Sequence, residues 1–302
     1  MDTDGPSTAI EPRFDLVSDG GLDASAGLAN DVPCAPFTVV FGQETFLAPA
    51  LARAEFFERL RAGTPHPTTS QPTPEQFGAL FRACTRPVLA VTISSGLSGS
   101  HNAADQARAL VPDVDVTLHD ARTLSGAQSF QVHAAMTARA QGLGIDTAIA
   151  WMRSVHAATE LFFTIDTLTY LQRGGRIGRV QATLGNVLQL KPVVRVEKTS
   201  GTYESIARAR TWDKAVGEIV GQVEARFPAG RPLRAIGLYG EDPGEAERLL
   251  ARLGERRELV WTDVLPEGVA LAVHTGPKAV GLAVMPAVWP WEEDEPPASR
   301  RG

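Results

Sequence analysis

Hydroxyl side chains gather in two short segments that each lead into a helical pattern. The first, TTSQPTPEQF (residues 68–77), places Thr69 and Ser70 just ahead of a predicted helix start. The second, TISSGLSGSHNAA (residues 92–104), contains Ser94, Ser95, Ser98 and Ser100. Free backbone N–H groups and the helix dipole favour an anion at such a position. Both segments therefore predict an anion-binding turn, with simple capping of the turn as the alternative reading.

Two other segments carry groups that can act on an anion. His274 ends the apolar run 270–274, which is predicted as a strand, and precedes a Gly-Pro turn, so it is expected at a pocket mouth or sheet edge. A lone histidine is more often structural. Arg173, Arg176 and Arg179 alternate with glycines, as in a phosphate cradle, but Walker spacing is absent. The alternative is a Gly-Gly break between two helices with solvated arginines.

An apolar stripe follows these arginines. It is formed by Val180, Leu184, Val187, Leu188 and Leu190. The stripe suits either the protein core or the wall of a lipid tunnel, and the pattern does not separate the two.

The serine-rich turn also allows an enzymatic reading. GLSGS (residues 96–100) is similar to the hydrolase motif G-x-S-x-G, with Ser98 as nucleophile and His274 as base. The fifth position is Ser100 rather than glycine, and no acid stands out to orient His274. A serine-dependent lipid or ester hydrolase is therefore kept as the alternative function.

The elements around these segments predict an α/β fold. In the first half, strand-like runs at 14–17, 36–41, 88–93 and 114–118 alternate with helical patterns at 53–61, 74 onward, 102–110, 125–140 and 147–155. This alternation is typical of a parallel sheet flanked by helices, in which ligands bind at the carboxyl ends of the strands. The second half predicts a mixed sheet and helices, including a hairpin formed by 193–196 and 202–206.

The 302 residues are divided into four parts on this basis. Residues 1–12 are predicted as a tail, 13–168 as an N-terminal α/β domain that carries the hydroxyl-rich turns, and 169–286 as a C-terminal α/β domain with a mixed sheet. Residues 287–302 are predicted as an acidic, Pro-rich tail. Its aromatic residues, Trp289 and Trp291, are expected to be loosely packed, with docking on the body as the alternative.

Composition excludes several classes of protein. The net charge of -6 and pI near 5.6 argue against a nucleic-acid surface. Cys34 and Cys84 lack metal-ligand spacing, so no metal site is predicted. The N-terminus lacks the basic and apolar regions of a leader, and no apolar run reaches the roughly 18 residues of a membrane span. We therefore expect a cytoplasmic protein without stable membrane insertion.

Six motifs in the right order closely resemble the DegV family of fatty-acid-binding proteins, whose members include the FakB binding subunits of bacterial fatty acid kinase. The resemblance spans about residues 14–285. The motifs are TSQPTPEQF (69–77), ISSGLSGSHNAA (93–104), DARTLSGAQ (120–128), LTYLQRGGRIGRVQATLGNVLQLKPVV (168–194), RARTWDKA (208–215) and HTGP (274–277).

The resemblance implies a DegV-like, two-domain α/β protein that buries a long-chain fatty acid. It places the carboxylate on Thr69 and Ser98, with Ser94 and Ser95 as neighbours. His274 and Arg176 are expected near the carboxylate, where they position it or engage the kinase. It further implies a carrier without catalysis of its own, with no cofactor beyond the bound fatty acid, which presents the carboxylate to a separate fatty acid kinase subunit for acyl phosphate formation. A lipid-sensing regulatory protein is the remaining alternative.

Three positions depart from the family pattern. The hydroxyls expected after Asp19 are replaced by Gly20 and Gly21, SGTY becomes SGSH at residues 98–101, and Lys278 follows HTGP where glycine is expected. The first departure weakens any ligand role for the N-terminal loop, and the last can alter the pocket mouth.

Overall fold

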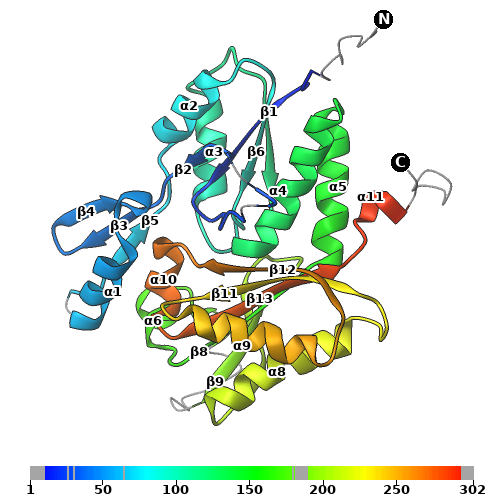
Figure 1. The fold of residues 1–302 in the computed structure, drawn as a ribbon. Coiled ribbons are helices and arrows are strands. Elements are labelled where there is room, and N and C mark those ends of the chain that lie inside the picture. The colour runs from blue at the N-terminus through cyan, green and yellow to red at the C-terminus, as the bar shows by residue number, and fades with distance from the viewer. Residues whose placement is uncertain are drawn as a thin grey trace, which may run out of the picture.

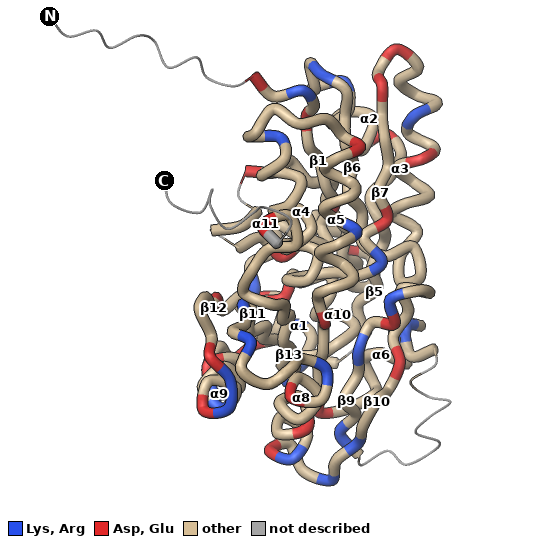
Figure 2. The backbone as a smooth tube through the Cα atoms, turned by 90° about the vertical axis from the view of Figure 1, so that its right-hand side faces the viewer, with Lys and Arg blue, Asp and Glu red and all other residues tan. Residues whose placement is uncertain are grey.

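The computed structural model describes residues 11–25, 27–29, 31–63, 65–178, 180 and 190–293. Its strands form a four-stranded, a six-stranded and a three-stranded sheet. Figure 1 shows the two larger sheets, each with its own helices, one above the other, and the small sheet beside them. Acidic and basic residues are interspersed along the tube in Figure 2, so no extended region collects one sign of charge.

The four-stranded sheet is parallel, as predicted. Its strand order is β2 (Cys34–Ala35), β1 (Asp15–Asp19), β6 (Val88–Thr92) and β7 (Val116–Asp120). All five residues of β6 are buried, as in a central parallel strand covered on both faces. Helices α2 (Pro74–Ala83) and α3 (Ser100–Arg108) pack on one face. Helix α4 (Ser125–Ala140) covers the other and pairs with α5 (Ile145–Ala158).

The start of α2 confirms the predicted capping box. The Thr73 hydroxyl accepts a hydrogen bond from the Gln76 backbone N–H at 3.3 Å, and the Gln76 side chain accepts from the Thr73 N–H at 2.7 Å. The helix therefore satisfies two of its free N–H groups internally.

The six-stranded sheet is mixed, which confirms the predicted fold class. Its order is β10 (Tyr203–Ala209), β9 (Lys191–Val196), β8 (Glu160–Ile165), β13 (Ala279–Pro286), β11 (Leu233–Tyr239) and β12 (Leu259–Pro266). Only β11 and β12 pair in parallel among these described strands. Helices α8 (Trp212–Arg226) and α9 (Pro243–Gly254) cover one face. Because β8 pairs with β13 and β9, the chain enters this sheet ahead of the predicted boundary at residues 168 and 169.

The three-stranded sheet corrects one sequence prediction. The run 36–41 was expected in the parallel sheet, but β3 (Thr38–Phe41) pairs antiparallel with β4 (Glu44–Leu47) and β5 (Thr68–Ser70). The cause is the tight turn between β3 and β4, where Gly42 takes a φ of 61° that disfavours other residues. The 3-10 helix η1 (Ala48–Ala50) and α1 (Arg53–Ala62) complete this subdomain.

The prediction of a strand at 270–274 was wrong. These residues belong to helix α10 (Val269–Thr275), and every residue of it except Leu271 is buried. A helix buried on nearly all sides shows no amphipathic pattern, so a short apolar run cannot be distinguished from a strand by periodicity. His274 consequently lies in the last turn of a helix rather than at a strand end.

The expectation that Trp289 and Trp291 are loosely packed was also wrong. Trp289 is 5% exposed and stacks on His133, with ring centroids 4.7 Å apart. Trp291 stacks between Trp289, at 4.9 Å, and Trp151 of α5, at 4.8 Å. The chain around α11 (Pro290–Glu293) is thus docked on α4 and α5. Among the described residues, none of the helices is long and apolar enough to cross a membrane.

Candidate ligand-binding site

Four of the residues predicted to meet an anion line one cavity of about 30 Å³. Thr69 comes from β5, Ser98 from the turn after β6, Arg176 from the loop after α6 (Thr169–Arg173), and His274 from the end of α10. The rest of the wall is mostly apolar, and is formed by Phe37, Ile93, Leu97, Leu124, Tyr203, Ala270 and Leu271. Residues far apart in the sequence therefore create a polar corner on an apolar cavity.

Thr69 and His274 form a hydrogen-bonded pair at this corner. The Thr69 Oγ1 to His274 Nε2 distance is 3.0 Å. Burial, followed by the positive charges of Arg176 and His66, lowers the pKa of His274 to about 3, so its ring is neutral at pH 7. With the proton on Nε2, the ring donates to Thr69 and leaves the Thr69 hydroxyl proton available to the cavity.

The Nδ1 edge of the His274 ring packs closely against Gly174. A methyl group added at Gly174 would lie 2.0 Å from His274 Nδ1, so the ring fits only because this residue has no side chain. His274 Nδ1 is buried, and no hydrogen-bond partner for it occurs in the described part of the chain. The ring position is thus set by packing behind it and by Thr69 in front of it.

Ser98 lies just ahead of α3, whose N-cap residue is Gly99, and its hydroxyl accepts rather than donates a hydrogen bond. Its Oγ accepts a hydrogen bond from the Ser100 backbone N–H at 3.2 Å. Ser100 itself donates to the buried carboxylate of Asp19, which also accepts from the backbone of Gly21 and Ile93. Ser98 therefore offers a hydroxyl donor beside Thr69, as a bound carboxylate requires.

Ser94 and Ser95 are not brought into this cavity. The Ser94 hydroxyl donates to the Gly201 carbonyl at 2.7 Å, and the Ser95 hydroxyl donates to Asp120 Oδ2 at 2.5 Å. These bonds attach the serine-rich turn to the β9–β10 hairpin and to β7.

Arg176 supplies the positive charge of the site. Its Nη1 donates to the Gly174 carbonyl at 2.6 Å and its Nε to the Leu97 carbonyl at 3.4 Å. Of the predicted tunnel residues, Val180 is buried in the main core, whereas Leu184, Val187 and Leu188, like Arg179, lie outside the described residues.

The geometry disfavours the hydrolase alternative. His274 bonds to Thr69 rather than to Ser98, and Ser98 bonds to a backbone N–H. Within residues the structure describes, no carboxylate hydrogen-bonds to His274 to orient it as a base. Nor do the described residues contain a cluster suited to a metal ion.

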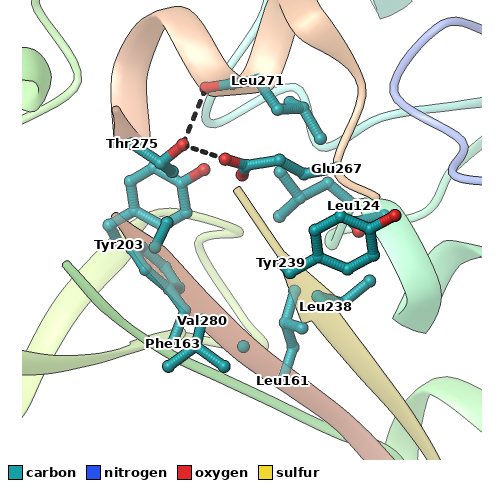
Figure 3. A pocket seen from close by; sticks show the side chains of 13 residues that line it. Leu124, Leu161, Phe163, Tyr203, Leu238, Tyr239, Glu267, Leu271, Thr275 and Val280 are labelled. Atoms are coloured by element: carbon teal, nitrogen blue, oxygen red, sulfur yellow. Dashed lines mark hydrogen bonds between the residues drawn. The ribbon is translucent and has the colours of Figure 1, made fainter. Parts of the chain in front are cut away.

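A second cavity of about 40 Å³, the inner cavity, adjoins the first and is shown in Figure 3. Leu124, Tyr203 and Leu271 line both. The inner cavity is walled largely by apolar residues of β8, β11 and β13, together with Glu267, which lies between β12 and α10, and Thr275, the last residue of α10. Ligand pockets commonly have at least roughly 300 Å³, so a long ligand must move the shared wall aside.

Sequence reasoning missed Tyr203 and Glu267. Glu267 is 8% exposed, and its Oε1 accepts a hydrogen bond from the Thr275 hydroxyl at 2.5 Å. Burial, with a smaller contribution from Asp23, raises the pKa of Glu267 to about 8, while the hydrogen bond from Thr275 and the charge of Arg53 oppose the rise. The only sequence signal for Glu267 was its place as a lone acid between two apolar runs. Tyr203 had no such signal.

Glu267→Gln is expected to reduce the pH dependence of stability. A carboxyl with a pKa of about 8 in the folded protein favours folding fully below its ordinary pKa of 4.5, and this contribution is lost as the pH rises to 8. Relative to the variant, the wild type should lose on the order of 4 kcal/mol of unfolding free energy between pH 5 and pH 8. Urea unfolding at both pH values measures this, with exposed Glu247→Gln as control. If the unfolding free energies of the wild type and Glu267→Gln change equally between pH 5 and pH 8, Glu267 does not have a raised pKa.

Comparisons with known proteins agree over nearly the whole chain. The family described as "Uncharacterised protein, DegV family" matches residues 13–287. A DegV domain-containing protein of Deinococcus radiodurans is 50% identical over 283 residues, which cover 93% of this chain and 98% of the relative. The structure of a fatty-acid-binding DegV family protein from Thermus thermophilus is 31% identical, with a TM-score of 0.82 over 91% of this chain and 99% of that one.

The fold also matches that of the Streptococcus pneumoniae fatty acid kinase B3 protein loaded with linoleic acid. The TM-score is 0.78 at 19% identity, over 90% of this chain and 99% of that one. At this identity the likeness concerns the fold.

Proposed function

The chain belongs to the DegV family, and on that basis we propose that it binds a long-chain fatty acid whose carboxylate lies at Thr69, Ser98, His274 and Arg176. The observation that carries the proposal is the hydrogen bond between Thr69 and the neutral His274, at one end of two adjoining, largely apolar cavities. The fatty acid binding of the Thermus thermophilus relative supports it.

The head group is recognised by hydroxyls and one guanidinium. Thr69, polarised by His274, and Ser98 each donate a hydrogen bond to a carboxylate oxygen, and Arg176 supplies the compensating charge. This arrangement avoids a fully buried ion pair, whose desolvation can exceed its attraction. It also leaves carboxylate oxygen lone pairs available for a phosphoryl donor.

The acyl chain supplies most of the affinity. About 14 buried methylenes at about 0.8 kcal/mol each give roughly 11 kcal/mol before ordering costs are subtracted. Part of this energy would be spent on moving Leu124, Tyr203 and Leu271, which line both cavities.

We further propose that this chain is a carrier that presents the carboxylate to a fatty acid kinase. The fold of the Streptococcus pneumoniae fatty acid kinase B3 protein supports this role. Two residues of the polar corner, Ser98 and Arg176, lie in loops rather than in helices or strands. A lipid-sensing regulator remains the second candidate, since it would need the same binding site.

Native mass spectrometry of the purified protein tests the binding function. We expect a retained fatty acid, identified after extraction, and at least tenfold weaker retention in Thr69→Val, which removes the hydroxyl but keeps the side-chain shape. Thr68→Val, an exposed neighbour on the same strand, is the matched control. A wild type that is empty and takes up no fatty acid would exclude the proposal.

The kinase role is tested by adding a fatty acid kinase catalytic subunit and ATP to the loaded protein. Hydroxylamine traps an acyl phosphate as a hydroxamate, and its formation is expected for a carrier. Binding without acyl phosphate would favour the regulator. Turnover of acyl esters that is lost in Ser98→Ala would favour the hydrolase instead.

A further inference from the structure

The inner cavity contains a polar cluster that the binding of a plain acyl chain does not use. The cluster consists of Tyr203, Glu267 and Thr275, which are 6%, 8% and 8% exposed. Figure 3 shows the Tyr203 hydroxyl, the Glu267 carboxyl and the Thr275 hydroxyl on the same side of the cavity, above Leu161 and Val280. An apolar tail would therefore pass beside three oxygen-bearing groups.

Hydrogen-bonding capacity remains unused in this cluster. The Thr275 hydroxyl donates to Glu267 Oε1 and lies 3.3 Å from the Leu271 carbonyl. No hydrogen bond to the second carboxyl oxygen, Oε2, is present in the described part of the chain, and the Tyr203 hydroxyl likewise has no partner among described residues. A hydrocarbon packed there would leave both groups without partners, which is unfavourable in a buried site.

Both free groups are neutral at pH 7 and close enough to interact electrostatically. Burial raises the pKa of Tyr203 well above its usual value, and the neighbouring charge of Glu267 contributes to the rise. Burial likewise raises the pKa of Glu267 to about 8. A phenol and a neutral carboxyl can each donate and accept, so together they can satisfy both the O–H and the lone pairs of one hydroxyl group.

The cluster also has a defined place along the bound chain. Tyr203 lines both the head-group cavity and the inner cavity, whereas Glu267 lines the inner cavity alone. An acyl chain that starts at Thr69 and His274 must pass Tyr203 to reach Glu267.

We infer that the preferred cargo is a hydroxylated fatty acid, whose chain hydroxyl is hydrogen-bonded by Glu267 and Tyr203. This inference rests on the proposed fatty-acid-binding function. A site built to pair a hydroxyl discriminates strongly against an analogue that lacks it, because the buried partners are then left unpaired.

The competing explanation is that Glu267 only connects the two ends of α10 through Thr275. It predicts that Thr275→Val and Glu267→Leu have similar effects, confined to stability. A specificity role predicts that Glu267→Leu and Tyr203→Phe change the choice of ligand, whereas Glu267→Gln, which keeps a donor and an acceptor, preserves it.

The experiment compares stearic acid with hydroxystearic acids that carry the hydroxyl at different carbons, in competition for delipidated protein. We expect at least one positional isomer to bind the wild type tenfold or more tightly than stearic acid. The ratio of the affinity for that isomer to the affinity for stearic acid should fall close to one in Glu267→Leu and Tyr203→Phe. It should be retained in Glu267→Gln. Tyr239→Phe is the matched control, because its hydroxyl points away from Glu267 in Figure 3.

The outcomes separate this inference from the proposed function. If the wild type binds stearic acid as tightly as every hydroxystearic isomer, or if the preference survives Glu267→Leu, the inference is wrong while fatty acid binding stands. If the wild type binds none of these acids, the proposed function fails and the inference fails with it.

Discussion

Replacing Gly174 with alanine is expected to weaken fatty acid binding strongly. The added methyl group would lie 2.0 Å from His274 Nδ1 and 2.7 Å from its Cε1, far inside contact distance. Gly174 has a φ of -77°, which alanine adopts without strain, so the effect must act through the histidine ring. Displacement of that ring breaks its hydrogen bond to Thr69, and we expect affinity to fall on the order of a hundredfold, the cost of losing a buried charge-assisted network.

Two further variants identify the cause of this loss. Gly221→Ala lies in α8 with open space around the added methyl group, so it should leave binding unchanged. The double variant Gly174→Ala, His274→Ala removes the clash. It should regain the stability that Gly174→Ala loses, but it should not regain binding. Calorimetric titration with a fatty acid and thermal unfolding measure the two quantities. Wild-type affinity in Gly174→Ala would contradict the described arrangement.

Gly96→Ala is expected to give the largest loss of stability. Its added methyl group would meet backbone rather than side chain, at 2.4 Å from the Ser200 carbonyl oxygen and 2.9 Å from that of Gly201. These carbonyls belong to the β9–β10 hairpin, which the Ser94 hydroxyl already holds at 2.7 Å. Because backbone cannot rotate away, the hairpin must separate from the serine-rich turn.

We expect this separation to cost about 3 kcal/mol, at the upper end of overpacking effects. Urea unfolding measures it against Gly221→Ala, which should be neutral or slightly stabilising as a helix substitution. An unfolding free energy for Gly96→Ala equal to that of the wild type would show that the packing of the four-stranded sheet against the six-stranded sheet does not depend on this contact.

Elements with a specific local signal were predictable from the sequence. The capping box at Thr73 located the start of α2, and the apolar run before the serine-rich turn located the central strand β6. Helix α10 was not predictable, because neighbours on all sides bury it and remove the periodicity. Likewise, β3 has a strand signal, but its partners are set by the turn at Gly42 and by β5.

The candidate site was predicted in part, and for a partly different reason. Thr69, Ser98, Arg176 and His274 share one cavity, as the DegV resemblance implied. Thr69, however, lies on a strand rather than at a helix N-terminus, and the start of α2 is occupied by its own capping box. Glu267 reaches the inner cavity only through the fold of the six-stranded sheet, which no local pattern specifies.

The binding site has no single rigid frame, because each of the three sheets contributes to it. Thr69 lies on the small antiparallel sheet, Ser98 follows a strand of the parallel sheet, and His274 precedes a strand of the mixed sheet. On the proposed function, separation of these parts would open the site, so the residence time of a bound acid would depend on their opening rate as well as on its affinity. A partner that contacts two of the parts can hasten release simply by holding them apart.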